Sequence, residues 1–419
     1  DTYNTAVGYN AGVAVTTGNQ NTLIGGLAGD AITTGNNNVA VGKSSLSANT
    51  TGAGNTALGE SALNENTTAS YNTAVGNSAL LANTTGTANV AVGYQALDAN
   101  TTAAGNNAVG SQALSTNTTG ASNNAMGQQA LFGNTTGANN TAIGHVALGD
   151  NTTGGNNTAI GYLALNANTG SYSNIAIGVR ALGSFNVTSA TSTYNVAIGE
   201  DAGGAVTTGV QNTLIGGLAG DAITTAANNT AVGYLSLSAT TTGAENTASG
   251  KQSLTANTTG ANNTAHGSRA LGSNTTASNN TAVGTDALLL NTTGAYNTAL
   301  GYRAGEYSTA VTTGSGNTYI GFAAGASKAT PVGELVLCST TGGAVGKGDN
   351  TGFISHSSGG TFQSNNSASW ATTSDERLKK NIVDSSLGLA EINQLQVRNF
   401  EYRTVSEITE LADTDVIDV

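Results

Sequence analysis

The sequence predicts an all-β fold, a repetitive β-solenoid or β-roll built from 17-residue coils. A short phrase, Asn-Thr-Ala-(Val/Ile/Leu)-Gly, returns at this spacing in 19 copies. Its glycines run at the strict period from Gly8 to Gly178 and again from Gly199 to Gly301. Only two intervals are longer, the one from Gly178 to Gly199 and the one from Gly301 to Gly321. A fixed short period is typical of a stacked, quasi-one-dimensional structure and not of a compact enzyme domain.

Composition supports an ordered array with little charge. Only 9% of the 419 residues are charged, and the chain has 58 glycines and one proline. Such a composition is also found in disordered chains, but disorder gives no reason for an aliphatic residue to return to the same position of every repeat. Net charge is −12, and residues 374–419 hold 10 of the 24 acidic residues. No basic patch is present, so we expect no nucleic-acid partner. No apolar run is long enough to span a membrane, so we expect no membrane insertion.

Each repeat is expected to form two very short β segments joined by turns. The Asn-Thr-Thr-Gly clusters break a helix in every repeat and supply turn conformations and side-chain hydrogen bonds instead. An aliphatic residue precedes the repeated glycine, and a Leu follows it at the fourth position in 13 of the 19 repeats. The other six repeats have Gly at that position: Gly12, Gly29, Gly203, Gly220, Gly305 and Gly325. The repeated glycine is expected to have positive φ or to allow close approach of two backbones.

The interior is expected to hold the Val or Ile before the glycine, the following Leu and some Ala. Stacked at a strand spacing of about 4.8 Å, the coils would rise about 90 Å in total. The neighbouring alanines Ala57, Ala74 and Ala91 would then face outward, and we interpret them as a subunit interface around a threefold axis. Residues 11–34 return almost unchanged as residues 202–225, which indicates that the array contains a larger duplicated block.

The repeat phrase resembles the head repeats of trimeric surface adhesins, and still more the repeat shafts of phage tail fibres. The resemblance covers residues 1–325. It implies a left-handed parallel β-roll and a homotrimer. The adhesin repeats are typically shorter, so the extra residues here are expected to enlarge the Asn-Thr-Thr-Gly loop.

Residues 326–373 are expected to form a β-rich transition region, with the only proline (Pro331), the only cysteine (Cys338) and the only tryptophan (Trp370). A single cysteine allows no intrachain disulfide.

The segment that begins Ser374-Asp-Glu-Arg-Leu-Lys379 closely resembles the start of the intramolecular chaperone domain of phage tailspikes and tail fibres. Residues 374–419 would be the α/β beginning of this domain, and the sequence ends before the family's remaining strands. The resemblance implies trimerisation, folding of the shaft in register, and self-cleavage between Thr373 and Ser374. Ser374 would be the nucleophile and Lys379 the general base, which is chemically reasonable because a partly desolvated lysine loses its proton readily. The alternatives are a chaperone that does not cut, or a helix for which Ser374 is the N-cap.

These features together predict a trimeric phage tail fibre on the virion, acting in host attachment. Its expected partners are a host cell-surface glycan or protein and other tail or baseplate proteins, with no cofactor and no metal. The alternatives are a bacterial trimeric surface adhesin on the cell surface, and a prophage or injection-system fibre. Specificity is expected in the outward loops, including the insertions 183–195 and 305–316, with Phe185, Tyr194 and Tyr307 as candidates for sugar stacking.

Other functions are less well supported by the sequence. Paired carboxylates for glycan cleavage are missing, since Glu200-Asp201 and Glu60/Glu65 lie in different coils. His145, His266 and His356 are scattered and form no metal-binding pattern. Triplets such as Asn49-Thr50-Thr51 match the glycosylation acceptor, but turn chemistry explains them better. Regular rows of threonine are also typical of ice-binding proteins, but here the Thr pairs lie beside Gly in expected turns and not on a flat strand face.

Overall fold

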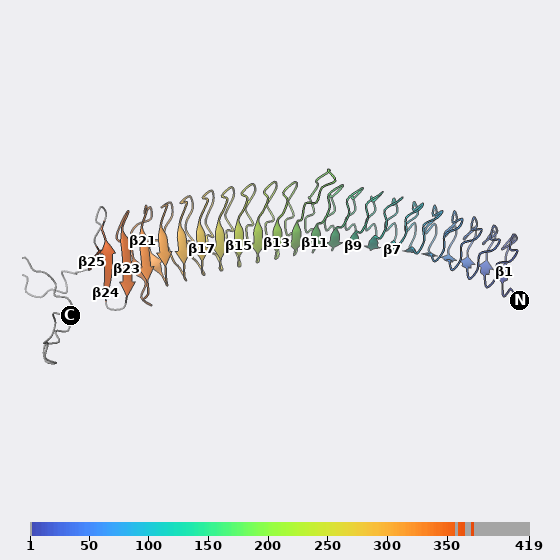
Figure 1. Cartoon of the computed structure of the whole chain (residues 1–419), viewed down its shortest axis with the longest axis horizontal. Coiled ribbons are helices and arrows are strands. Elements are labelled where there is room, and N and C mark those ends of the chain that lie inside the picture. The colour runs from blue at the N-terminus through green and yellow to red at the C-terminus, as the bar shows by residue number, and fades with distance from the viewer. Residues whose placement is uncertain (1, 357–358, 365–369, 373–419) are drawn as a thin grey trace, which may run out of the picture. The chain divides into compact units, whose positions relative to one another are not determined.

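The computed structural model describes residues 2–356, 359–364 and 370–372. The chain divides into two units, Asp1–Thr372 and Thr373–Val419, and the second unit lies wholly outside the described residues. The first unit is a solenoid in which one strand per coil stacks on the next (Figure 1). The described residues contain strands, turns and bends, and no helix.

Each of the 19 repeats contributes a strand of three residues that ends at the residue before the repeated glycine, which is apolar except for Ser249 and His266. These strands are β1 (Thr5–Val7), β2 (Thr22–Ile24), β3 (Val39–Val41), β4 (Thr56–Leu58), β5 (Thr73–Val75), β6 (Val90–Val92), β7 (Asn107–Val109), β8 (Asn124–Met126), β9 (Thr141–Ile143), β10 (Thr158–Ile160), β11 (Ile175–Ile177), β12 (Val196–Ile198), β13 (Thr213–Ile215), β14 (Thr230–Val232), β15 (Thr247–Ser249), β16 (Thr264–His266), β17 (Thr281–Val283), β18 (Thr298–Leu300) and β19 (Thr318–Ile320).

Every strand pairs in parallel with the strand of the next coil, in a register that sets equivalent residues side by side. Ala40 pairs with Ala57, for example, and Val41 with Leu58. The ladder crosses both longer intervals without a shift, because Ala176 pairs with Ala197 and Ala299 with Tyr319. The two insertions therefore extend the loops and leave the ladder intact. These observations confirm the predicted all-β solenoid of 17-residue coils.

The solenoid continues beyond the last copy of the repeat phrase. In the described part of the chain six further strands follow: β20 (Ala324–Gly325), β21 (Leu335–Cys338), β22 (Ala344–Val345), β23 (Gly352–His356), β24 (Gly359–Gln363) and β25 (Trp370–Thr372). Strand β21 pairs in parallel with β19, and β23 with β21, while β20 pairs with β22. Direction then reverses, because β24 is antiparallel to β23 and β25 is antiparallel to β24. The β-rich region thus adds two parallel coils before the reversal.

The prediction of two β segments per coil is wrong for the first 18 repeats, because only the segment before the glycine is a strand there. The last repeat alone adds a second strand, β20, after its glycine. The segment that carries the recurring Leu consists of successive turns. Ser44 and Leu46 both adopt left-handed φ, 56° and 54°, which an extended segment excludes. The turn still contributes to stacking, since the Leu46 N–H donates to the carbonyl of Ala62 in the next coil at 3.0 Å.

The predicted orientation of the strands is also wrong. The strand-centre alanines point into the interior, and the aliphatic residues beside them point outward. Ala57 is 0% exposed, whereas Leu58 is 47% exposed. Successive strand side chains face opposite sides, so only one of the two can be internal. The Leu of the turn segment occupies the space facing the strand, which leaves room only for a methyl group. The alanines are therefore core residues and not a subunit interface.

The repeated glycine combines positive φ with close contact between coils, as the sequence predicted. Gly42 has φ of 138°, and a Cβ built on it would lie 2.4 Å from the carbonyl oxygen of Gly59. Any side chain would collide with backbone that the stacking holds in place.

Two internal ladders of buried asparagines bind the coils together. In the first ladder, the Asn55 N–H donates to Asn38 Oδ1 at 2.9 Å, and Asn55 Nδ2 donates to the carbonyl of Ala69 at 2.9 Å. In the second, Asn66 Nδ2 donates to Asn49 Oδ1 at 2.8 Å. Asn49 is completely buried, so the Asn-x-Thr triplet at that position is structural and inaccessible to glycosylation in the folded chain.

The first ladder ends at a buried carboxylate, Glu334, in place of an asparagine. The Glu334 N–H donates to Asn317 Oδ1 at 2.9 Å, which continues the ladder. Its carboxylate accepts from the hydroxyl of Tyr319 at 3.1 Å and from the N–H groups of Ser327 and Gly348. The pKa of Tyr319 is raised by burial and by the neighbouring negative charge of Glu334.

Candidate ligand-binding pocket

The two residues predicted for self-cleavage lie outside the described residues. Ser374 and Lys379, and the bond between Thr373 and Ser374, belong to the second unit of the chain. Their roles stay predictions based on the resemblance. Function must therefore be sought on the solenoid itself.

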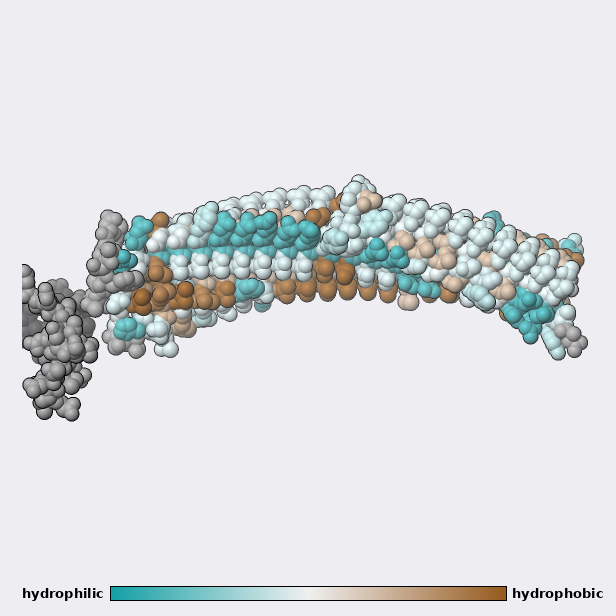
Figure 2. All heavy atoms as spheres, in the orientation of Figure 1, coloured by the Kyte–Doolittle hydropathy of each residue, from teal (hydrophilic) through white to brown (hydrophobic). Residues whose placement is uncertain are grey.

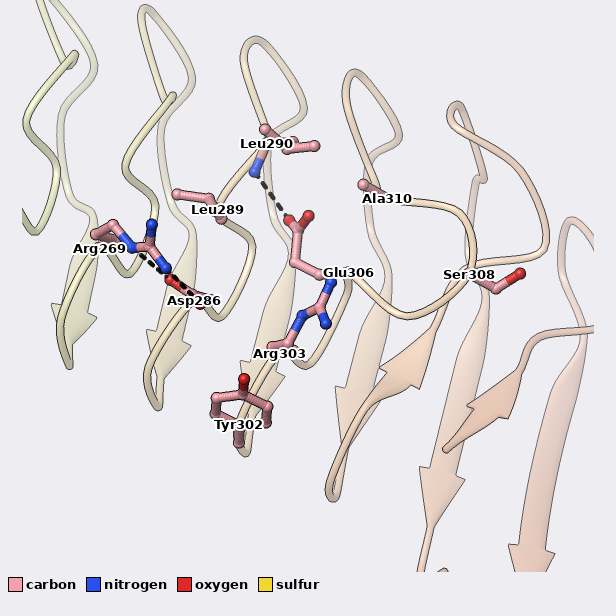
Figure 3. A pocket seen from close by; sticks show the side chains of 9 residues that line it. All are labelled: Arg269, Asp286, Leu289, Leu290, Tyr302, Arg303, Glu306, Ser308 and Ala310. Atoms are coloured by element: carbon pink, nitrogen blue, oxygen red, sulfur yellow. Dashed lines mark hydrogen bonds and ion pairs between the residues drawn. The ribbon is translucent and has the colours of Figure 1, made fainter. Parts of the chain in front are cut away.

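A pocket of about 570 Å³ lies beside the insertion 305–316 (Figure 3). It spans the coils of β16 to β18, and both charged and apolar side chains line it: Arg269, Asp286, Leu289, Leu290, Tyr302, Arg303, Glu306, Ser308 and Ala310. The inserted residues Ser308 and Ala310 close one side of the pocket, so the longer interval in the sequence coincides with a concave surface. This volume suits a small ligand of one or two rings.

Three of the charged residues occupy the same position in successive coils, the second after the repeated glycine. Arg269, Asp286 and Arg303 all adopt left-handed φ, between 53° and 58°, so equivalent backbone presents their side chains in a row. Asp286 pairs with Arg269, with Nε to Oδ1 and Nη2 to Oδ2 distances both 2.8 Å. The next coil has Ala323 at this position. Arg303 consequently has no ion pair with any described residue.

Glu306 and Asp286 are both buried acids of the pocket, each with only 7% of its surface exposed, and Glu306 is the one without an ion pair to a described residue. One carboxylate oxygen, Oε1, accepts a hydrogen bond from the Leu290 N–H at 2.9 Å (Figure 3). Burial raises the pKa of Glu306 to about 7, against the lowering effects of this hydrogen bond and of the Arg303 charge. The negative charge of Asp286 contributes a smaller increase. Glu306 therefore changes charge near neutral pH.

An aromatic pair continues the pocket toward the next coil. Tyr302 lines the pocket and stacks on Phe322, with ring centroids 5.5 Å apart and an interplanar angle of 19°. Their exposed fractions are 47% and 46%, so about half of each side chain is available to a ligand. Both residues directly follow the repeated glycine of their coils.

The three aromatic residues that the sequence suggested for sugar stacking differ in their exposure to solvent. Phe185 is 0% exposed and belongs to the core, so that prediction is wrong. In its coil the ring fills the position that an asparagine of the second ladder occupies elsewhere. Tyr194 is exposed. Tyr307 is half-buried, and a Cβ on Gly343 would lie 2.8 Å from its ring, so it packs against the following coil.

A smaller pocket of about 310 Å³ lies beside the other insertion, 183–195. Arg180 and Asp201 line it together with Leu163 and Ser184. The guanidinium of Arg180 makes a two-point contact with Asp201, with an Nε to Oδ1 distance of 2.8 Å. This pair satisfies both charges, so the pocket lacks the unpaired cation of the larger one.

The remaining polar candidates are dispersed along the solenoid. Glu60 pairs with Lys43 at 3.5 Å, and Glu200 and Asp201 lie in another coil. His145 stacks on Tyr162 with centroids 5.6 Å apart, and His266 points outward from β16. Within the described ranges, no group of three or more His, Cys, Asp or Glu side chains could hold a metal ion.

A second surface feature is the row of outward residues that end the strands, here named the aliphatic column. Its most exposed members are Val7, Leu58, Met126 and Leu300. Figure 2 shows hydrophobic side chains gathered along one edge of the solenoid between the strands labelled β7 and β21 in Figure 1. Because the ladder keeps its register, these side chains form one row along the solenoid. Only Ser249 and His266, at the ends of β15 and β16, interrupt its apolar character.

Comparison of the chain with protein-family models, curated proteins and solved structures finds no match in any of the three. In the part of the chain that the structure describes, no helix is long and apolar enough to cross a membrane. Function must therefore be inferred from the repeat pattern, the aliphatic column and the pocket.

Proposed function

We propose that this chain is the shaft of a homotrimeric phage tail fibre or a fibre-like appendage, which acts in attachment to a host cell surface. The observation that carries the proposal is the aliphatic column. Monomeric soluble proteins rarely expose a long contiguous apolar strip, and such strips mark interaction surfaces. The proposed trimer, the virion location and the host glycan or protein partner extend the resemblance of residues 1–325 to tail-fibre shafts and adhesin heads.

The aliphatic column suits contact with further copies of the same chain. A copy placed in parallel and in register would bring equivalent outward side chains together at every coil, so an apolar contact repeats along the solenoid except at Ser249 and His266. The strand-centre alanines are already used inside each chain, so the neighbouring residue is the one left for assembly. This moves the proposed interface from Ala57, Ala74 and Ala91 to the residues that follow them, such as Leu58.

Repetition also explains why a chaperone would be useful. Coils that look alike can pair in wrong registers, and a slip by one coil costs little where neighbours are equivalent. A C-terminal segment that brings three chains together first removes this ambiguity. The proposed role of residues 374–419, including cleavage before Ser374, follows from this need and from the resemblance.

The test replaces three outward residues of neighbouring coils with acids in the full-length gene product, as V92D/V109D/M126D. The matched control, T102D/T119D/T136D, adds the same charge to exposed loop positions of neighbouring coils. Native mass should show a trimer for the wild type and the control. The outward variant should be a monomer with unchanged β-sheet circular dichroism. A monomeric wild type, or a trimeric outward variant, would contradict the proposal.

The chaperone role is tested by denatured mass of the same gene product beside Ser374→Ala. We expect the wild type to split before Ser374 and the variant to stay whole while both form trimers. An uncut wild type that still forms trimers would make the C-terminal segment a permanent part of the fibre, and an equally cut variant would exclude Ser374 as the nucleophile.

A further inference from the structure

The larger pocket contains a cation, Arg303, that forms no ion pair with a described residue. In the row Arg269, Asp286 and Arg303, one carboxylate lies between two guanidinium groups. Asp286 forms its ion pair with Arg269. Arg303 thus keeps its planar set of donors free of any ion pair with a described residue. A guanidinium of this kind matches the two oxygens of a carboxylate with parallel hydrogen bonds.

The aromatic pair gives the pocket a flat apolar side close to that cation. Tyr302 precedes Arg303 in the chain and lines the same pocket. Its stacked partner Phe322 extends the flat surface to the next coil. The apolar C–H face of a pyranose ring fits a half-exposed aromatic ring of this kind, while the hydroxyl groups at the ring's edge remain free for hydrogen bonds.

Glu306 supplies the complementary polar group. Its Oε1 is fixed by the Leu290 N–H, and no described residue donates to its second oxygen, Oε2, which is left to receive or donate a hydrogen bond. The groups that act on Glu306 are the Leu290 N–H, the Arg303 cation and the Asp286 anion. Because burial raises its pKa to about 7, the carboxyl is mostly protonated at pH 6 and adds little negative charge against an acidic ligand there.

We propose that this pocket binds an acidic sugar of the uronic-acid type, with its carboxylate on Arg303, its ring on Tyr302 and a hydroxyl group on Glu306. A single free cation and a flat aromatic surface suit one carboxylate on a ring better than a phosphate dianion. The proposal names a ligand class for host attachment, so its biological role rests on the proposed function, although the binding itself does not require a trimer.

The test is calorimetric titration of the full chain with a galacturonic acid trisaccharide, and with a galactose trisaccharide as the neutral probe, at pH 6. We expect the acidic trisaccharide to bind at least tenfold more tightly than the neutral one. R303Q should remove this preference, and R303K, which keeps the charge without the planar donors, should retain part of it. R180Q is the matched control, since Arg180 has the same position in its coil and lines the other pocket; it should bind like the wild type.

The pH dependence provides an independent readout. Affinity of the wild type for the acidic trisaccharide should fall several-fold between pH 6 and pH 8, as Glu306 ionises and repels the ligand. E306Q should bind with little change over this range. Equal binding of both trisaccharides, no binding of the acidic one, or unchanged preference in folded R303Q would each overturn the proposal.

Native mass of the same samples separates this proposal from the fibre proposal. A trimer that ignores the acidic trisaccharide would overturn the pocket assignment and leave the assembly standing. A monomer that binds it through Arg303 would support the pocket and contradict the fibre.

Discussion

Two kinds of coil build the same solenoid, and they fill its interior differently. In the Leu-Asn coils, such as the one with Leu97 and Asn100, the strand centre is Ala, the turn contributes Leu and the loop contributes a ladder asparagine. In the Gly-aliphatic coils, represented by Gly203 and Gly220, the turn residue is Gly. There Leu214 at the centre of β13 is the bulky group, and the loop contributes Val206 and Ile223: all three are completely buried.

The comparison shows that the interior volume stays the same in both kinds of coil, while the position in the repeat that supplies the filling side chain changes. A Cβ on Gly203 would lie 2.7 Å from Leu214 Cδ1, and a Cβ on Gly220 would lie 2.8 Å from Leu214 Cδ2. One strand leucine thus fills the space of two turn leucines. Leu23 lies in the same way between Gly12 and Gly29. The duplicated segments 11–34 and 202–225 therefore carry a complete packing solution, which explains why the substitutions occur together.

The largest effect is expected from Leu214→Ala, because this side chain serves two coils. Loss of a buried leucine costs about 2–5 kcal/mol and more where the cavity cannot collapse. The two flanking glycines offer nothing to fill the space, so we expect about 4–5 kcal/mol from urea unfolding. The matched change in a Leu-Asn coil, Leu97→Ala, should cost about 3 kcal/mol, because Leu80 and Leu114 remain above and below. Equal costs would remove the distinction between the two kinds of coil.

A second test places the missing leucine back on the turn, as Gly203→Leu. The backbone permits it, since Gly203 has φ of 60° and Leu97, at the equivalent position, has φ of 55°. The obstacle is Leu214, so overpacking should cost about 3 kcal/mol. The double variant G203L/L214A should recover most of that loss, and the measurement is the interaction energy of the double-mutant cycle. Additive losses would show that backbone strain, and not interior volume, requires the glycine.

A third test measures how stability depends on pH through Glu306, which directly follows Gly305 in another Gly-aliphatic coil. Its folded pKa of about 7 exceeds the ordinary value of 4.5, so the folded chain holds this proton more tightly than the unfolded chain does. Stability from this group is greatest at low pH and falls as pH rises through 7. Between pH 5 and pH 7 the loss should be about 2 kcal/mol. The difference between wild type and E306Q in urea unfolding at the two pH values isolates this contribution, and a difference that does not change with pH would contradict it.

Much of this architecture could be predicted from the sequence, because period and glycine position follow from repetition alone. The orientation of the strands could not. Alternation shows that Ala57 and Leu58 face opposite sides, but the inner side depends on the room left by the leucine of the turn. The left-handed φ of Leu46 was unexpected for the same reason, since a bulky residue is uncommon there and tertiary packing imposes it.

The pocket was only partly visible in the sequence. The insertion 305–316 was expected to carry specificity, yet Tyr302, Arg303 and Glu306 were missed. A signal was present, because the only three arginines of residues 1–321, Arg180, Arg269 and Arg303, all stand at the second position after the repeated glycine. The ion pair of Asp286 could not be predicted from the sequence, because Asp286 lies between two arginines and only the side-chain geometry shows that it pairs with Arg269.

The smallest effect is expected from moving one feature of the Gly-aliphatic coils into the other region, as Asn100→Val. Asn100 Nδ2 donates to Asn83 Oδ1 at 2.8 Å and to the carbonyl of Ala103, and its Oδ1 accepts from Asn117. Valine breaks these three bonds but buries apolar surface, as Val206 does in its own coil. Buried polar groups that lose a partner cost about 1–3 kcal/mol, and the apolar gain offsets part of this, so a net loss of about 1–2 kcal/mol is expected. Ile223→Asn is the reciprocal change. It should cost more, because neither neighbouring coil has an asparagine at this position to accept a hydrogen bond from the new side-chain amide. If Ile223→Asn were the milder of the two, the ladder and the aliphatic filling would be interchangeable at single coils, and the block of co-occurring substitutions would need another cause.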